Sequence, residues 1–307
     1  MAARPTHAGP GVSAGASRAM RSLAADPRAA VAMVVLGLAA VAALAAPLLA
    51  PDGTELGDVV ARRFVSPLGR TPDGAFHLLG TDRFGRDLTL RLMDGARVSL
   101  AVGAMAAMVA AVLGAVLGAL AGFAGGWVDR GISAVVDAAL AVPRVPFLLL
   151  LVALFEPGVG ITVLAIGLTG WMTIARLVRA DVMTLRRREF VEAARALGAT
   201  PGRILVRHVL PHALAPVLVA TALAVGQAIT LEAGLSFLGL GVQPPTASWG
   251  NMIAAGRDAL VVAPWVALAP ALAVALVVLA CSLLADALES AVAGERTSSA
   301  GQEAPQR

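Results

Sequence analysis

Lysine is absent from this chain of 307 residues, so all 24 of its basic residues are arginines. The absence excludes chemistry that needs a lysine amine, such as a Schiff base or the P-loop lysine that reaches nucleotide phosphates. With 20 acidic residues, the net charge is +4. Arginines in so hydrophobic a chain indicate cytoplasmic flanks of membrane spans, and we expect no nucleic-acid partner.

Cysteine and the common catalytic motifs are also scarce. The only cysteine, Cys281, lies in a hydrophobic run, so it cannot form an internal disulfide and is expected to pack as a small apolar residue. The chain lacks a His-Glu-x-x-His zinc motif, a Gly-x-Ser-x-Gly nucleophile elbow and a P-loop. We therefore expect neither an enzyme nor a chain that binds its own metal or cofactor.

Charge of either sign is sparse. Only 14% of the residues are charged and 58% are hydrophobic, whereas a soluble domain carries about a quarter charged residues. This composition predicts an integral membrane protein whose main solvent is the bilayer.

Six hydrophobic runs predict an all-α fold with six transmembrane helices, because about 20 apolar residues cross the bilayer. The first, 29–50, follows arginines and is similar to a secretory signal. Signal h-regions span only about 7–15 residues, which favours an uncleaved span. The other spans are expected at 98–123, 134–155, 159–177, 213–237 and 263–284.

Polar segments flank this core of residues 98–288. The ends, 1–28 and 289–307, are expected to be disordered tails, and 51–97 to be extracytoplasmic. Six spans place both tails on one side, together with fourteen arginines against eight on the other, so both termini are expected in the cytoplasm. Seven of the eight arginines on the other side lie in 51–97, and they weaken the charge argument for this orientation.

Glycines and tryptophans add detail to the spans. Gly114, Gly118 and Gly122 share one face of the second span, where a neighbouring helix can approach closely. Trp249 and Trp265 fall near a predicted outer boundary, as interfacial tryptophans often do.

The polar loop between the fourth and fifth spans, residues 186–212, carries helical signals. An i, i+3, i+4, i+7 spacing predicts a short helix with one apolar stripe, formed by Phe190, Ala193, Ala194 and Leu197. On its flank, ion pairs are possible at three- and four-residue spacing between Arg188, Glu192 and Arg195.

A turn and a second helix should follow. Gly198 stands where helices commonly end in a left-handed conformation. Thr200 suits the N-cap of the second helix and Pro201 its first position. That helix should run to Leu210, and Pro211 should interrupt the backbone hydrogen bonding before the fifth span. Spacing alone leaves open an amphipathic loop on the headgroups, a helix-turn-helix without DNA, and a docking element.

Several motifs are specific to a known family. Glu192-Ala193-Ala194, Gly198 and Leu210-Pro211 resemble the EAA motif of binding-protein-dependent ABC importer permeases. The similarity covers roughly residues 77–290 and is greatest to the C-type subunit of the dipeptide/oligopeptide/nickel permeases. The further motifs that carry it are Gly80-Thr81-Asp82, Gly85-Arg86-Asp87, 95–100, 125–129, 235–245 and 248–252.

The resemblance implies the type I ABC importer permease fold, in the lipid of a bacterial cytoplasmic (inner) membrane. It implies three kinds of partner: a B-type permease, two cytoplasmic ATPases that use ATP and Mg, and an extracytoplasmic substrate-binding protein. The expected cargo is a dipeptide or oligopeptide, with nickel or another small solute as the alternative. Matched by position, the ATPase-coupling residues are Phe190, Glu192, Ala193, Ala194, Leu197, Gly198, Leu210 and Pro211.

Charged residues inside predicted spans indicate the translocation path, because a charge in the bilayer is costly without a partner or water. Asp137 and Arg144 lie two turns apart on the third span, where they line a wet cavity or pair across it. Alternatively, Asp137 marks the cytoplasmic boundary and Arg144 snorkels. Glu232 either hydrogen-bonds the Ser236–Gly241 turn or gates the outer path.

Two further hypotheses are weaker. His208 and His212 are spaced like metal ligands, but Pro211 lies between them and no third ligand is nearby, so no metal site is predicted. A secondary transporter is the alternative of a different class. It would show paired broken helices in two repeated halves, and no internal repeat is evident.

Overall fold

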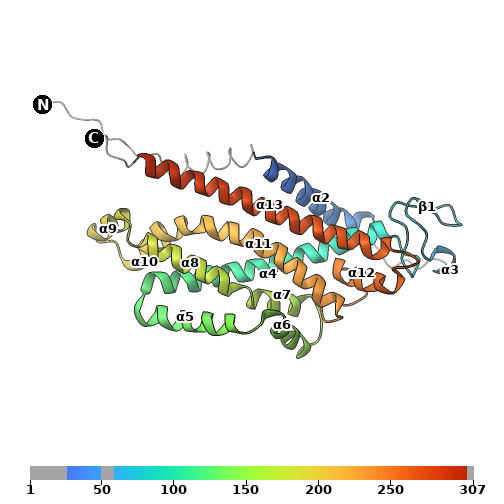
Figure 1. Cartoon of the computed structure of the whole chain (residues 1–307), viewed down its shortest axis with the longest axis horizontal. Helices are drawn as coiled ribbons and strands as arrows, with labels where there is room; N and C mark the ends of the chain where they lie inside the picture. The colour runs from blue at the N-terminus through green and yellow to red at the C-terminus, as the bar shows by residue number, and fades with distance from the viewer. Residues whose placement is uncertain (1–25, 50–58, 303–307) are drawn as a thin grey trace.

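The computed structural model describes residues 26–49 and 59–302, and these form a bundle of long helices (Figure 1). Five segments in this part of the chain are long and apolar enough to cross a membrane. The bent pair α5 (Gly126–Ala141) and α6 (Arg144–Ala153) makes a sixth if it counts as one span. The predicted first span corresponds to α2 (Pro27–Leu49).

The remaining elements follow in chain order. They are α3 (Val59–Arg62), β1 (Gly69–Arg70), β2 (Phe76–His77), α4 (Leu88–Ala124), α7 (Val159–Leu168), α8 (Trp171–Leu185), α9 (Glu189–Ala196), α10 (Pro201–Ile204), a π-helical turn (Leu205–Val209), α11 (Leu210–Phe237), α12 (Trp249–Gly256), a 3-10 turn (Arg257–Ala259) and α13 (Trp265–Gln302).

The two ends of the bundle differ (Figure 1). One end carries α9 and α10, and α2 begins and α13 ends toward that side. The opposite end carries α12 and the antiparallel pair β1–β2, in which Gly69 faces His77. There His77 Nδ1 lies 2.6 Å from a carboxylate oxygen of Asp87, which also caps the start of α4.

The glycine stripe of α4 packs against α8. A Cβ atom added at Gly118 would lie 2.4 Å from the carbonyl oxygen of Ala175, and one at Gly122 would lie 2.7 Å from that of Arg179. Gly114 is similarly crowded. The prediction that these glycines allow a close helix approach is confirmed, and the neighbour is α8.

The third span is not the continuous helix 134–155 that we expected. The chain breaks at Val142 and Pro143, and α5 and α6 meet at 88°. A proline disfavours helical backbone angles in the residue before it. Val142, which precedes Pro143, accordingly has extended angles (φ −82°, ψ 127°).

Other boundaries also differ from expectation. α4 begins at Leu88 rather than 98, because Asp87 accepts hydrogen bonds from the amides of Thr89 and Leu90. α13 continues to Gln302, where we expected a disordered tail from 289. Ala291 and Ala293 favour helix just beyond 289, but Gly294 and the run Thr297-Ser298-Ser299 do not, so no local feature of the sequence explains how far the helix continues. The expected tail at 1–25 and residues 50–58 lie outside the described residues.

Trp249 is buried rather than interfacial. Its indole Nε1 donates to the carbonyl of Leu92 at 3.0 Å, and its backbone amide donates to the hydroxyl of Ser99 at 3.1 Å. The tryptophan therefore fixes α12 against α4 instead of anchoring the chain at the headgroups.

Candidate functional site

α9 packs onto the bundle through two small side chains. Val191 is fully buried and Ala194 nearly so, in a cluster with Ile204 and Val209. Of the predicted stripe, Ala194 packs inward, whereas Phe190, Ala193 and Leu197 are exposed. Val191 was missed because apolar residues lie on both sides of this short helix, and spacing does not tell which side the chain itself covers.

The adjoining side of α9 is apolar and open. Leu197 is 89% exposed and Phe190 is 38% exposed, and Ala193 between them is exposed too. Glu192 is exposed and forms no ion pair with Arg188 or Arg195 among the described residues. An exposed leucine beside a phenylalanine on a polar loop is typical of a surface that a partner covers.

Gly198 ends α9 as predicted, with φ +81°. The amide of Ala199 donates to the carbonyl of Ala194 at 3.1 Å, and that of Gly198 donates to the carbonyl of Arg195 at 3.0 Å. These two bonds form a Schellman motif, which satisfies the last carbonyls of the helix. Thr200 occupies the predicted N-cap position of α10, but its side chain makes no capping bond.

The helix continues through Pro211 into the fifth span, although the proline has no amide to donate to the backbone hydrogen bonding. α10, the π turn and α11 follow one another without a break as a single span, Pro201–Phe237. The amide of Leu210 donates to the carbonyl of Leu205, an i to i−5 bond. The wider turn accommodates the missing amide of Pro211, since such turns insert one extra residue into a helix.

Of the two histidines spaced like metal ligands, His212 makes contacts within the chain. The ring of His212 stacks on Phe190, with centroids 5.2 Å apart, and its Nδ1 lies 2.8 Å from the backbone carbonyl of His208. No group of three metal-ligating side chains occurs among the described residues. The stack instead joins α9 to the first turn of α11.

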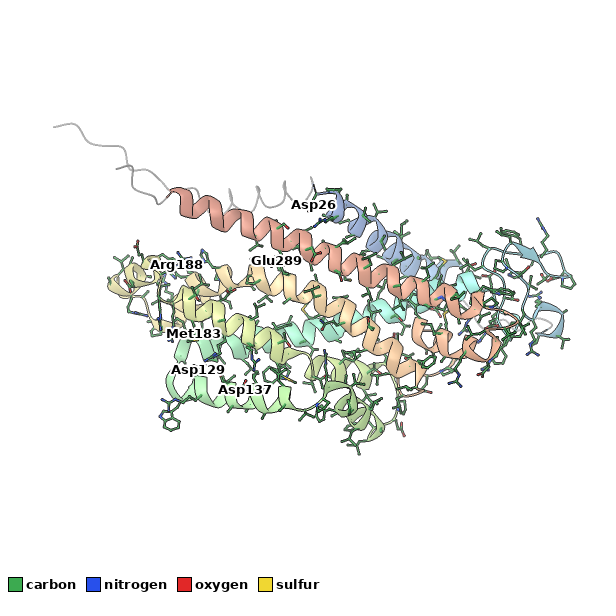
Figure 2. The ribbon with its side chains drawn as sticks, in the orientation of Figure 1. Asp26, Asp129, Asp137, Met183, Arg188 and Glu289 are labelled. Atoms are coloured by element: carbon green, nitrogen blue, oxygen red, sulfur yellow. The ribbon has the colours of Figure 1, made fainter. Side chains whose placement is uncertain are left out.

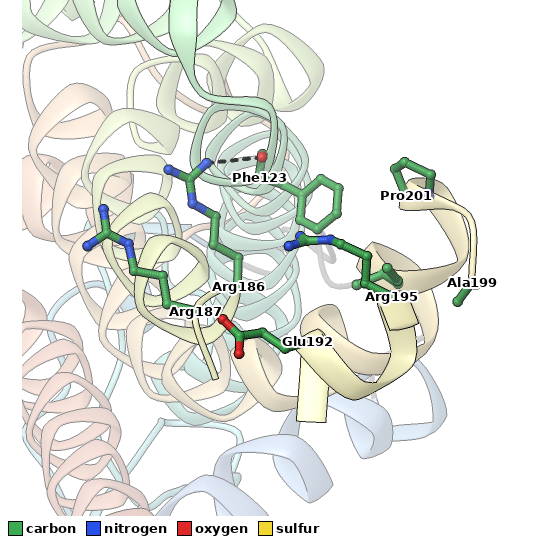
Figure 3. A pocket seen from close by; sticks show the side chains of 8 residues that line it. Phe123, Arg186, Arg187, Glu192, Arg195, Ala199 and Pro201 are labelled. Carbon is green, nitrogen blue, oxygen red and sulfur yellow. Dashed lines mark hydrogen bonds between the residues drawn. The ribbon is translucent and has the colours of Figure 1, made fainter. Parts of the chain in front are cut away.

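A basic cavity of about 480 Å³ lies beneath α9 and α10 (Figure 3). Arg186 points to the end of α4, where its guanidinium donates to the carbonyl of Phe123 at 3.1 Å. The cavity is lined by three arginines, one acid and four less polar residues: Arg186, Arg187, Arg195, Glu192, Phe123, Ala199, Pro201 and Ile204.

A second contact holds the same region. Arg179 of α8 donates to both carboxylate oxygens of Asp129 in α5, at 2.8 Å for Nη2 and Oδ2. Gly125, between α4 and α5, has φ +68° and lets the chain turn there. Arg179 and Arg186 therefore tie α8 to the α4–α5 turn directly before the 186–212 loop.

Asp137 and Arg144 do not come together, so the hypothesis that they pair is wrong. Asp137 accepts from Arg176 of α8 at 2.5 Å, and both side chains are largely exposed. Figure 2 shows Asp129 at the same end of the bundle as Arg188, with Asp137 farther along α5. The break at Pro143 separates the two predicted partners, because they lie on helices that meet at 88°.

Arg144 instead reaches the end of α7. Its Nε lies 3.4 Å from the hydroxyl oxygen of Thr169 and its Nη2 lies 3.3 Å from the carbonyl of Ile166. It also borders a groove of about 350 Å³ between α6, α11 and α13. The groove is lined by Arg144, Leu223, Gly226, Gln227, Thr230, Leu231, Val278 and Ser282.

Glu232 is fully buried and lies at the centre of a hydrogen-bond network. Its carboxylate accepts from the hydroxyls of Ser99 at 3.0 Å and Ser236 at 2.7 Å. The Ser236 hydroxyl in turn accepts from the amide of Val242 at 3.0 Å. Of the two hypotheses for Glu232, the contact with the Ser236–Gly241 turn is the one observed.

Comparison with known proteins identifies the family. Residues 114–294 match the family model described as "Binding-protein-dependent transport system inner membrane component". The chain belongs to this family.

Relatives match beyond that region. A putative peptide permease protein of Brucella suis is 42% identical over 217 residues, 70% of this chain and 72% of the relative. The dipeptide transport system permease protein DppC of Alkalihalophilus pseudofirmus is 38% identical over 71% of this chain and 72% of the relative. The glutathione transport system permease protein GsiD of Shigella flexneri is 43% identical over 70% of this chain and 71% of the relative.

A solved structure shares the fold. The chain superimposes on inward-facing MetNI, a methionine ABC transporter, with a TM-score of 0.53 and 21% identity, covering 66% of this chain and 95% of that one. The permease thus has the all-α type I ABC importer fold that the motifs imply, with the 186–212 loop between its fourth and fifth spans.

Proposed function

We propose that this permease is the C-type membrane subunit of a peptide importer, that it forms half of the translocation path, and that its 186–212 loop couples it to an ATPase. The open apolar side of α9 is the observation that carries the proposal. Leu197, Phe190 and Ala193 are exposed on a short helix whose other side is locked in the bundle. A partner that covers this face can push on the spans attached to it.

The physical path for such a push is short. Displacement of α9 acts on α8 through the backbone at Arg188, and on α11 through the stack of Phe190 on His212. α8 is clamped to α4 and α5 by Arg186 and Arg179. Gly198 sets the angle between α9 and α10. Movement of the loop therefore reaches four spans at once.

The partners follow from this role. A B-type permease completes the path, two cytoplasmic ATPases use ATP and Mg while this chain binds no cofactor, and an extracytoplasmic binding protein delivers the cargo. Both termini then lie in the cytoplasm of the bacterial inner membrane, on the side of α9 and α10. A peptide cargo is supported by the relatives, whose names specify peptide, dipeptide and glutathione transport.

The test is purification of the chain from its own cells with the proteins bound to it. We expect one other permease and an ATPase to co-purify, and the complex in sealed vesicles to accumulate members of a dipeptide library when ATP and the binding protein are present. Accumulation by this chain alone, without an ATPase, would disprove the proposal. A complex that accumulates only nickel would disprove the peptide cargo.

A further inference from the structure

The groove beside Arg144 lies at mid-depth of the bundle. Gln227, on its α11 wall, stands ten residues before the end of that helix at Phe237. Ten residues of α-helix rise about 15 Å, which is about half of the hydrocarbon thickness of a bilayer. Leu223, Gln227 and Thr230 of this wall are exposed in the isolated chain.

Arg144 brings an uncompensated charge to this depth. Its contacts are with neutral oxygens, of Thr169 and Ile166, and no carboxylate pairs with it among the described residues. The two acids predicted for the translocation path are engaged elsewhere, since Asp137 binds Arg176 and Glu232 binds two serines. An arginine within a membrane span is costly unless water or an anion compensates it, and such residues commonly mark a solute path.

The other polar groups of the groove suit a peptide. Thr230 and Ser282 donate their hydroxyl protons to backbone carbonyls at 2.9 and 3.1 Å. Their oxygens thus remain acceptors for an N–H group. The side-chain amide of Gln227 has no hydrogen-bond partner in the described chain. Its NH₂ group is therefore free to donate and its oxygen to accept. A cation alone would be repelled by Arg144 and would leave the N–H donors of Arg144 and Gln227 without a partner.

We propose that Arg144 binds the carboxylate of a peptide as it crosses the membrane, while Gln227, Thr230 and Ser282 contact its polar groups. A guanidinium presents paired N–H donors that match the two oxygens of a carboxylate. This inference rests on the proposed function, and it assigns to the groove a substrate group, the carboxylate. The competing role for Arg144 is purely structural, because its bond to Ile166 also caps the last turn of α7.

The experiment compares Arg144→Gln with Arg144→Lys in the complete complex, assembled with its ATPases and binding protein in proteoliposomes. Uptake of a dipeptide library and ATP hydrolysis are measured together. Glutamine retains a donor for the Ile166 carbonyl but no charge, whereas lysine retains the charge. We expect Arg144→Gln to lower dipeptide uptake per ATP by about ten-fold or more, and Arg144→Lys, which keeps the charge but not the paired donors, to lower it less.

Arg176→Gln is the matched control, because it removes an exposed arginine whose partner is Asp137. It should leave uptake per ATP unchanged. Uptake in Arg144→Gln equal to the wild type would overturn the proposal. So would a parallel fall of uptake and ATP hydrolysis, since that indicates a structural arginine. A wild-type complex that carries no dipeptide would instead contradict the proposed function itself.

Discussion

The guanidinium of Arg186 donates to the carbonyl oxygen of Phe123 at 3.1 Å, and thereby joins the last turn of α8 to the last turn of α4. The two residues are 63 positions apart in the sequence. Phe123 lies at the end of its helix, where carbonyls have no partner within the helix. The bond therefore satisfies an orphan acceptor and fixes the point from which the 186–212 loop departs.

Arg186→Ala should weaken this joint. A hydrogen bond from a charged donor contributes about 1.5–3 kcal/mol, and partial exposure of this arginine places the loss near the lower value. We expect a lower unfolding temperature of the complex in detergent and less uptake per ATP. Arg187→Ala, which removes a neighbouring arginine of the same cavity, should cost less stability. An equal loss in the two variants would show that the Phe123 contact is not specific.

Gly118→Leu should prevent the close packing of α4 on α8. The added Cβ would lie 2.4 Å from a backbone carbonyl, which cannot move away as a flexible side chain does. Overpacking costs about 1–3 kcal/mol, so folded protein recovered from the membrane should fall sharply. Gly37→Ala in α2 is the control, because an added Cβ meets nothing within 4 Å. A stable Gly118→Leu protein would mean that the two helices do not approach so closely.

Gly198→Val should abolish uptake while membrane insertion continues. The glycine has φ +81°, a conformation that costs other residues about 1–2 kcal/mol, and more when they are β-branched. No atom lies within 4 Å of an added Cβ in the described structure, so strain rather than a clash causes the effect. Gly202→Ala in α10 has the same free space without the positive φ and should retain uptake.

Leu197→Asp and Glu192→Lys should detach the ATPase without unfolding the permease. Both side chains are exposed in the isolated chain, so their replacement removes no internal contact. A buried interface anchor contributes about 2 kcal/mol or more, which predicts at least an order of magnitude less co-purified ATPase for Leu197→Asp. Val261→Asp, an equally exposed apolar position near the start of α13, should leave the ATPase bound. Normal ATPase recovery and uptake in both loop variants would refute the coupling role.

Ser99→Ala should destabilise the fold near α12. The serine hydroxyl donates to Glu232 and accepts from the amide of Trp249, so its removal leaves two buried groups unsatisfied. Such groups cost about 1–3 kcal/mol each. The natural probe is Cys281, which is 4% exposed and should react with a maleimide only as the chain unfolds. Labelling should occur at a lower temperature than in wild type, whereas Ser290→Ala, at an exposed position of α13, should not change it.

The sequence predicted features whose cause is local. Gly198 is left-handed because a helix ends there, and the glycines of α4 face α8 because four-residue spacing puts them on one side. The break in the third span was also signalled locally, by Pro143, but a hydropathy window averages over a single residue.

Other features depend on which helices become neighbours. The ion pair of Asp137 joins residues 39 positions apart, and no spacing rule identifies Arg176 as its partner. Val191 was missed for the same reason, since its burial depends on Ile204 and Val209 across the turn. The bond of Glu232 to Ser99 spans 133 positions. Helical signals thus predicted the elements, while three-dimensional packing decides their contacts.

The π turn at Leu205–Val209 fixes the direction in which the loop points around the axis of the fifth span. Each residue of an α-helix advances about 100° around the axis, so one residue added or removed there swings everything beyond it by more than a quarter of a circle. A single-residue deletion within this turn would leave the composition of α9 intact and rotate its open face away from the present direction. The permease is therefore far less tolerant of a length change at this point than of most substitutions along the same surface.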